Sequence, residues 1–122
     1  MSKYLNPAVI DAALDYLANN ADKAILFNAY SADYATITAG KLAEVTLASG
    51  DFTKAAGDIS GRKVTVAGKT NIDVLANGQF NHIALVKTAT SQVLAITDGT
   101  AKNLNQGDKA NFAAFDVEIE AP

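Results

Sequence analysis

The sequence contains no cysteine and no tryptophan, and it has only one histidine and two prolines among 122 residues. Without cysteine, the chain has neither disulfide bonds nor thiolate zinc sites, so the folded state must depend on packing or on assembly. A single histidine also leaves too few nitrogen ligands for an ordinary zinc site. The lack of tryptophan removes the largest aromatic platform on which a glycan could stack.

Long hydrophobic runs and dense positive charge are also missing. No apolar run approaches the roughly 20 residues that span a bilayer, and Met1–Leu5 is not followed by the apolar core of a signal peptide. We therefore expect synthesis in a cytosol and no membrane partner. The ten lysine and arginine residues are scattered, and the net charge is -3. Nucleic-acid surfaces need a basic patch, so we expect no nucleic-acid partner.

What the chain does have is enough apolar material for one core. Hydrophobic residues make up 49% of the sequence and charged residues 19%, which is not a disordered composition. A chain of this length suits one domain. We expect a single domain over residues 1–122, with a helix at about 7–18 and a β-sandwich at about 23–120.

The helix is predicted from its start signal and its apolar spacing. Asn6 can accept hydrogen bonds from the free amides of a first helical turn, and Pro7 suits the first helical position. Apolar residues then recur three and four positions apart, which places them on one face of a helix. They are Val9, Ile10, Ala13, Leu14 and Leu17. Asn19–Asn20 then favours termination of the helix.

Residues 60–67 give the strongest strand signal. Val64 and Val66 point to one face, whereas Lys63 and Thr65 point to the other, as the period of two in a strand requires. We expect further strands at 23–28, 42–47, 71–75, 80–86, 92–97 and 111–119.

Turn signals recur between these strands at roughly ten-residue intervals. They include Asn77–Gly78, Asp98–Gly99 and Gln106–Asp108, the first of which predicts a tight hairpin. The pattern predicts a mainly β fold, an antiparallel β-sandwich (jelly-roll-like) with one N-terminal α-helix.

For two regions the sequence allows two structural predictions each. Residues 30–37 are predicted to form a turn or a short helical piece, with Ser31 as a candidate cap. Residues 49–61 hold three glycines around Phe52 and Ile59. We predict a surface loop anchored by these two apolar side chains. A long hairpin connection is the alternative.

Few residues in the sequence are arranged for chemistry. His82 has no acidic residue or cysteine close to it in sequence, so we interpret it as a hydrogen-bonded structural residue. Ser60 lies in no Gly-x-Ser-x-Gly elbow and is interpreted as part of a turn. Phosphate-binding glycine loops and the ligand series of a calcium loop are absent. We predict no catalytic residue, no cofactor, no metal and no enzyme activity; Asp73 and Asp116 are the acidic pair that would test a hydrolase hypothesis.

Contacts with a partner are predicted instead from aromatic and basic residues. Tyrosines on helices and loops suit interfaces, because the ring is buried while the hydroxyl stays hydrogen-bonded; core packing is the alternative. An Arg-Lys pair can meet a carboxylate of a partner or can simply be a solvated edge. The residues that we expect to contact a partner are Tyr4, Tyr30, Tyr34, Phe52, Arg62 and Lys63.

Four segments together resemble a known family. They are Asp11–Leu17 in the predicted helix, Asp58–Val66, His82–Val86 and Ala114–Ile119. They occur in the family's order and span most of the chain, although little between Tyr30 and Thr53 matches. The sequence resembles small structural proteins of tailed bacteriophages, which are encoded with head genes and regarded as capsid decoration, or cement, proteins.

This resemblance implies a role and no active-site residues. It implies a virion structural protein on the capsid surface, made in the host bacterial cytoplasm, that binds the lattice of the major capsid protein and stabilises the head. The class also implies a homo-oligomer, with a trimer favoured. The alternatives are another phage component, such as a tail, neck or fibre protein or a head module that binds host glycans, and a small hydrolase with an acidic site.

Overall fold

The computed structural model describes residues 3–58 and 60–120. The chain forms two compact units. The first unit comprises the residues up to 20, residues 48–68 and the residues from 113 onward; the second comprises residues 21–47 and 69–112. Each unit is described by itself, and the single domain remains a prediction.

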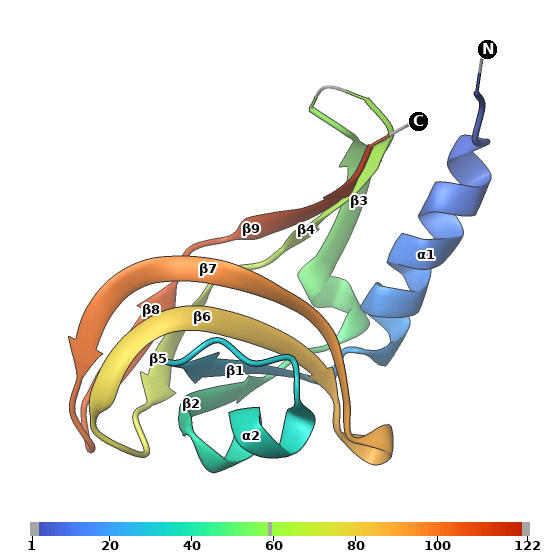
Figure 1. Ribbon diagram of the computed structural model, residues 1–122. Helices are drawn as coiled ribbons and strands as arrows, with labels where there is room; N and C mark the ends of the chain where they lie inside the picture. The colour runs from blue at the N-terminus through green and yellow to red at the C-terminus, as the bar shows by residue number, and fades with distance from the viewer. Residues whose placement is uncertain (1–2, 59, 121–122) are drawn as a thin grey trace. The chain divides into compact units, whose positions relative to one another are not determined.

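The first unit is one long helix against a three-stranded antiparallel sheet (Figure 1). Its strands run in the order β3-β4-β9. The helix packs mainly on β4, the central strand. The elements are α1 (Pro7–Asn20), η1 (Ser49–Asp51), β3 (Phe52–Ala56), β4 (Arg62–Val66) and β9 (Phe115–Ile119).

Helix α1 begins where the sequence predicts. The Asn6 side-chain oxygen accepts a hydrogen bond from the Ala8 N–H at 2.8 Å, which satisfies one free amide of the first turn. The buried residues are Ile10, Leu14 and Leu17. The predicted stripe was too wide, because Val9 and Ala13 are exposed. A helix that rests on a single narrow sheet buries only the residues directly above it.

The strand predicted within residues 60–67 is confirmed as β4, and it is the central strand of its sheet. Val64 and Val66 are both 0% exposed, and β4 pairs with β3 on one edge and β9 on the other. The surface loop predicted over 49–61 is wrong, because residues 52–56 of it form β3, which pairs with β4. Phe52, one of the two apolar side chains of the predicted loop, is half-buried at the start of β3. The other, Ile59, lies outside the described residues.

The second unit contains a four-stranded antiparallel sheet in the order β2-β1-β6-β7 and a separate antiparallel pair, β5-β8. The sheet is built from β1 (Lys23–Phe27), β2 (Lys41–Thr46), β6 (Gly78–Lys87) and β7 (Gln92–Leu104). The pair consists of β5 (Lys69–Asp73) and β8 (Lys109–Phe112), and the helical pieces are α2 (Tyr34–Ala39) and η2 (Thr88–Thr90).

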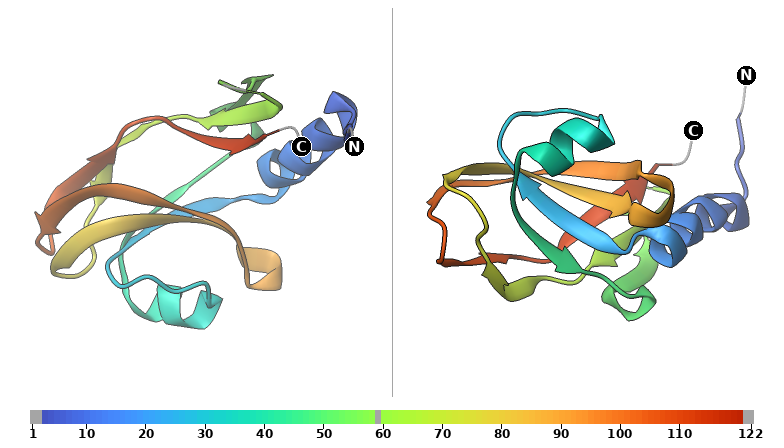
Figure 2. Two further views of the ribbon diagram at one scale, coloured as in Figure 1. Left: turned by 45° about the horizontal axis from the view of Figure 1, so that its top comes forward. Right: turned by 90° about the horizontal axis from the view of Figure 1, so that it is seen from below.

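Strand β1 is buried on both faces, as its continuous apolar run predicts. Helix α2 lies over one face of the sheet (Figure 2). There a core cluster is formed by Ile25, Phe27, Ile37, Ala84 and Val86. The intervening residues of β1 and β6 point to the other face and are buried as well.

The short helical piece is confirmed within 34–39, but its cap is Asp33 and not Ser31. The Asp33 carboxylate accepts hydrogen bonds from the N–H of Thr36, at 3.0 Å, and from its hydroxyl, at 2.7 Å. These bonds, the hydroxyl first, hold the pKa of Asp33 below its ordinary value. Ser31 instead accepts a bond from the Asp33 N–H.

Two predicted turns are wrong because pairing over long distances overrides local turn preference. Asn77–Gly78 does not join a hairpin: β5 pairs with β8, and β6 pairs with β1 and β7. Asp98–Gly99 lies inside β7, with Asp98 opposite His82. A side chain at Gly99 would meet the ring of Phe80 at 2.2 Å, so the glycine serves close packing and not a turn.

The single strand predicted over residues 111–119 is wrong, because the chain forms two separate strands in this region. Residues 109–112 form β8 in the second unit, and residues 115–119 form β9 in the first unit. The predicted turn at Gln106–Asp108 is confirmed, since Gly107 has φ +93° and the Asp108 N–H donates to the Asn105 carbonyl. The predicted fold class is confirmed: the protein is mainly antiparallel β with one long helix near the N-terminus.

Candidate functional site

The six predicted partner-contact residues fall into two groups. Tyr4 is 79% exposed before α1, and Tyr30 is 68% exposed in the loop after β1. Tyr34 and Phe52 are half-buried, and Tyr34 packs against the core cluster beneath α2. Tyr34 and Phe52 contribute packing within their own units, and both exposed tyrosines offer an apolar ring to a partner. The role of all four residues as partner contacts stays a prediction.

The two basic residues are engaged within the first unit. The Arg62 Nε lies 2.8 Å from the Asp11 carboxylate on α1. The Lys63 Nζ lies 2.7 Å from the carboxylate of Asp58 and 3.2 Å from that of Asp116. The role of Arg62 and Lys63 as partner contacts stays a prediction, and any partner would compete with these ion pairs.

This cluster shifts two ionisation equilibria. The hydrogen bonds of Lys63, first to Asp58 and then to Asp116, hold the pKa of its ammonium above the ordinary value. The hydroxyl of Thr65 and then Lys63 hold the pKa of the Asp116 carboxyl below its ordinary value. Asp116 therefore stays ionised and bonded, which suits a structural role on the sheet face better than proton transfer.

Asp73, the other half of the acidic pair, belongs to the second unit, where its carboxylate forms an ion pair with Lys109. Asp73 and Asp116 therefore form no site within either unit. Among residues 3–58 and 60–120 there is also no group of three or more histidine or acidic residues placed to hold a metal ion.

His82 has one acidic neighbour that the sequence did not reveal. Its Nδ1 lies 3.1 Å from a carboxylate oxygen of Asp98, and its ring contacts those of Phe27 and Tyr30. The side chain of His82 is only 19% exposed. Asp98 was missed because it was assigned to a turn, whereas β7 continues through it beside β6. The contacts agree with the interpretation of His82 as a hydrogen-bonded structural residue.

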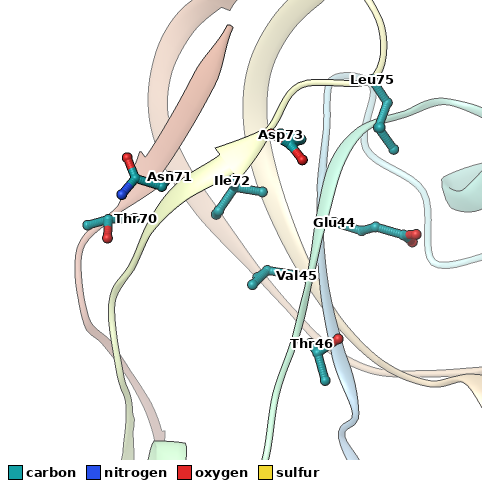
Figure 3. Close-up of a pocket in the computed structure, with 8 residues that line it drawn as sticks. All are labelled: Glu44, Val45, Thr46, Thr70, Asn71, Ile72, Asp73 and Leu75. Atoms are coloured by element: carbon teal, nitrogen blue, oxygen red, sulfur yellow. The ribbon is translucent and has the colours of Figure 1, made fainter. Parts of the chain in front are cut away.

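A groove of about 460 Å³ lies between β2 and β5 of the second unit (Figure 3). The strands meet at one bridge, Ala43 with Val74, and the Leu75 N–H donates to the Leu42 carbonyl at 2.7 Å. From Leu75 back toward Thr70 the two strands diverge (Figure 3). The lining residues are Glu44, Val45, Thr46, Thr70, Asn71, Ile72, Asp73 and Leu75.

The charges that line this groove are already compensated. Glu44 lies 3.5 Å from Lys23 and 3.3 Å from Lys41, and Asp73 pairs with Lys109. The remaining polar groups are hydroxyls and an amide, which can donate and accept hydrogen bonds but are weak acids and bases. The groove therefore offers a polar contact surface and no evident proton-transfer pair.

The outer face of α1 is a second exposed surface, which was not predicted as a whole from the sequence because Val9 was assigned to the buried face of the helix. Val9 is 55% exposed and Tyr16 is 51% exposed, whereas a surface helix normally turns charged residues to water. Both were available as signals in the sequence: Val9 and Tyr16 lie seven residues apart, with Ala12 between them.

Comparisons of the chain with protein-family models, with curated proteins and with solved structures find no match. Within the described part of the chain, no helix is long and apolar enough to cross a membrane.

Proposed function

We propose that the chain is a structural protein of a tailed-phage virion that decorates the capsid, binds the lattice of the major capsid protein and stabilises the head. The observation that carries the proposal is the exposure of Tyr4 and Tyr30 on a chain whose basic residues are largely paired internally. Exposed tyrosines are characteristic of docking surfaces, because the ring gains from burial and the hydroxyl can hydrogen-bond.

The segments that carry the family resemblance agree with a structural role. Asp11–Leu17 lies in α1, and residues 62–66 form β4. Residues 82–86 lie in β6, and residues 115–119 form β9. These segments supply buried side chains and sheet pairing, as a small, stable docking protein requires. Homotrimer formation, a jelly-roll strand order and a location on the capsid surface are parts of the same proposal.

Cosedimentation tests the proposal. Purified protein is mixed with expanded heads that lack it, from the phage that encodes the chain, and bound protein is measured in the pellet. We expect saturable binding, with weaker binding for Tyr4→Ala and Tyr30→Ala. The exposed Lys102 on β7 provides the control, since Lys102→Ala should bind like the wild type.

Three results are distinguishable. Binding to heads that is insensitive to both tyrosine variants keeps the role and rejects the contact residues. Binding to isolated tails and not to heads favours the alternative of a tail or neck component. Protein that remains in the supernatant with both preparations contradicts a decoration role.

A further inference from the structure

The only two charged side chains of helix α1 form ion pairs with strands of its own sheet. Asp11 lies 2.8 Å from Arg62, and Asp15 lies 2.7 Å from Lys54 on β3. Asp11 and Asp15 are four residues apart, so both ion pairs lie along one side of the helix. The exposed residues of α1 therefore carry no charge, whereas Asp11 and Asp15 are partly buried.

The exposed residues have the spacing of a helix-packing seam. Val9, Ala12 and Tyr16 follow one another at intervals of three and four residues, which is the a/d pattern of a coiled coil. Val9 and Tyr16 are more than half exposed, and Leu5, which precedes the helix and lies outside its repeat, is 36% exposed. The buried stripe of Ile10, Leu14 and Leu17 has the same spacing, so α1 carries two seams and its own sheet covers only one.

We infer that the outer seam of α1, defined by Val9, Ala12 and Tyr16, packs against the same seam of a second copy of this chain. The seam is complementary to itself. Val9 and Tyr16 project as knobs one heptad apart, and Ala12 leaves a depression between them that can receive a knob of an identical helix. An identical patch on each copy is what a symmetric homo-oligomer uses.

Charge favours the same occupant. Two copies repel each other because each carries a net charge of -3. The outer seam adds no charge to this repulsion, because both carboxylates of the helix are bound to basic residues of the sheet. Close approach at this face therefore places no unpaired charge opposite its own copy.

The size of the seam sets the strength of the contact. A helix of 14 residues is about 21 Å long and roughly 10 Å wide, so its face covers about 200 Å². A standard stable interface buries about 800 Å² per partner. The contact therefore forms weakly in dilute solution and is favoured where copies are concentrated. This inference does not require the proposed capsid role.

Cysteine cross-linking tests the seam directly, because the chain has no cysteine of its own. Ala12→Cys places a thiol in the seam, and Ala39→Cys places one at an exposed helical alanine in the second unit. Under the same oxidising conditions, we expect disulfide-linked oligomers of Ala12→Cys to form at least about tenfold faster, since held thiols react at a higher effective concentration. Equal rates for the two variants would overturn the inference.

Sedimentation velocity over a concentration series up to about millimolar supplies an independent readout. The wild-type average mass should rise with concentration, and Val9→Asp should weaken association at least about tenfold by placing an unpaired charge in the seam. Asp is favourable in the first turn of a helix, so this change should leave α1 folded. Ala35→Asp in the first turn of α2 is the matched control and should associate like the wild type.

A wild type that remains monomeric throughout, or one whose association is the same in Val9→Asp, contradicts the proposed surface. Neither measurement uses phage heads. Failure of self-association is therefore separable from failure of capsid binding, which is measured only by cosedimentation.

Discussion

At the scale of single residues, hydrogen bonds of Asp22 connect the start of β1 to the end of β6. Its carboxylate accepts hydrogen bonds from the Thr88 N–H at 3.0 Å and from the Thr88 hydroxyl. Its backbone also bonds Val86 and Leu47. Burial by itself would raise the pKa of Asp22, but the two bonds from Thr88 outweigh it and hold that pKa below the ordinary 3.8.

This shift predicts a stability that depends on pH. Since the folded-state pKa of Asp22 is the lower one, its contribution is complete above the unfolded-state pKa and is lost as pH falls through 3.8 toward the folded-state value. We expect Asp22→Asn to lower the free energy of unfolding at neutral pH by about 1–2 kcal/mol. Urea unfolding should show this difference shrinking below about pH 4.

The exposed turn residue Asp108 supplies the control for this measurement. Asp108→Asn should change the unfolding free energy little at any pH. A difference between wild type and Asp22→Asn that stays constant down to the acid limit would show that the Asp22 charge does not stabilise the fold.

Gly99 gives a second prediction at the residue scale. A Cβ at Gly99 would lie 2.2 Å from the Phe80 ring, whereas a Cβ at Gly50 would meet nothing within 4 Å. We expect Gly99→Ala to cost about 1–3 kcal/mol through overpacking. Gly50→Ala should be nearly neutral, and Phe80→Leu should recover part of the cost of Gly99→Ala in a double-mutant cycle. Equal effects of the two alanines in thermal unfolding would refute the packing explanation.

At the scale of elements, apolar packing should hold α1 to its sheet more strongly than its ion pairs do. Leu14 is 1% exposed, so Leu14→Ala should cost about 2–4 kcal/mol. The Asp11 and Asp15 pairs are partly exposed to solvent, and Asp11→Asn or Asp15→Asn should each cost less than about 1 kcal/mol. Denaturant unfolding followed by circular dichroism measures all three. A larger loss for the charge variants than for Leu14→Ala would reverse this ranking.

Some features of helix α1 could be predicted from the sequence alone, and others could not. The start of α1 at Asn6–Pro7 and its buried core of Ile10, Leu14 and Leu17 follow from local signals, because capping and helical periodicity act within a few residues. The exposure of Val9 does not follow from those signals. It depends on the width of the sheet beneath the helix, which is assembled from residues 52–66 and 115–119.

At the scale of the whole molecule, the alternation of apolar and polar residues predicted most strands but not which strands pair with each other. The strand of residues 62–66 was predicted closely, since period-two burial is a local property. The pairing of β5 with β8, and the passage of β7 through Asp98–Gly99, are decided by contacts between distant residues, which override turn preference. The exposed Tyr4 and Tyr30 were predicted as contacts from residue type, whereas the groove between β2 and β5 depends on a single bridge far apart in sequence.

The role in the virion also belongs to this scale, and one measurement tests it most directly. Heads that lack the protein are heated with and without saturating amounts of it, and the temperature at which the genome is released is recorded by dye fluorescence. Decoration predicts that the release temperature rises with occupancy and reaches a plateau when the lattice is full, because a ligand that binds only the intact head stabilises it. A release temperature that stays the same at every protein concentration would contradict the proposed function.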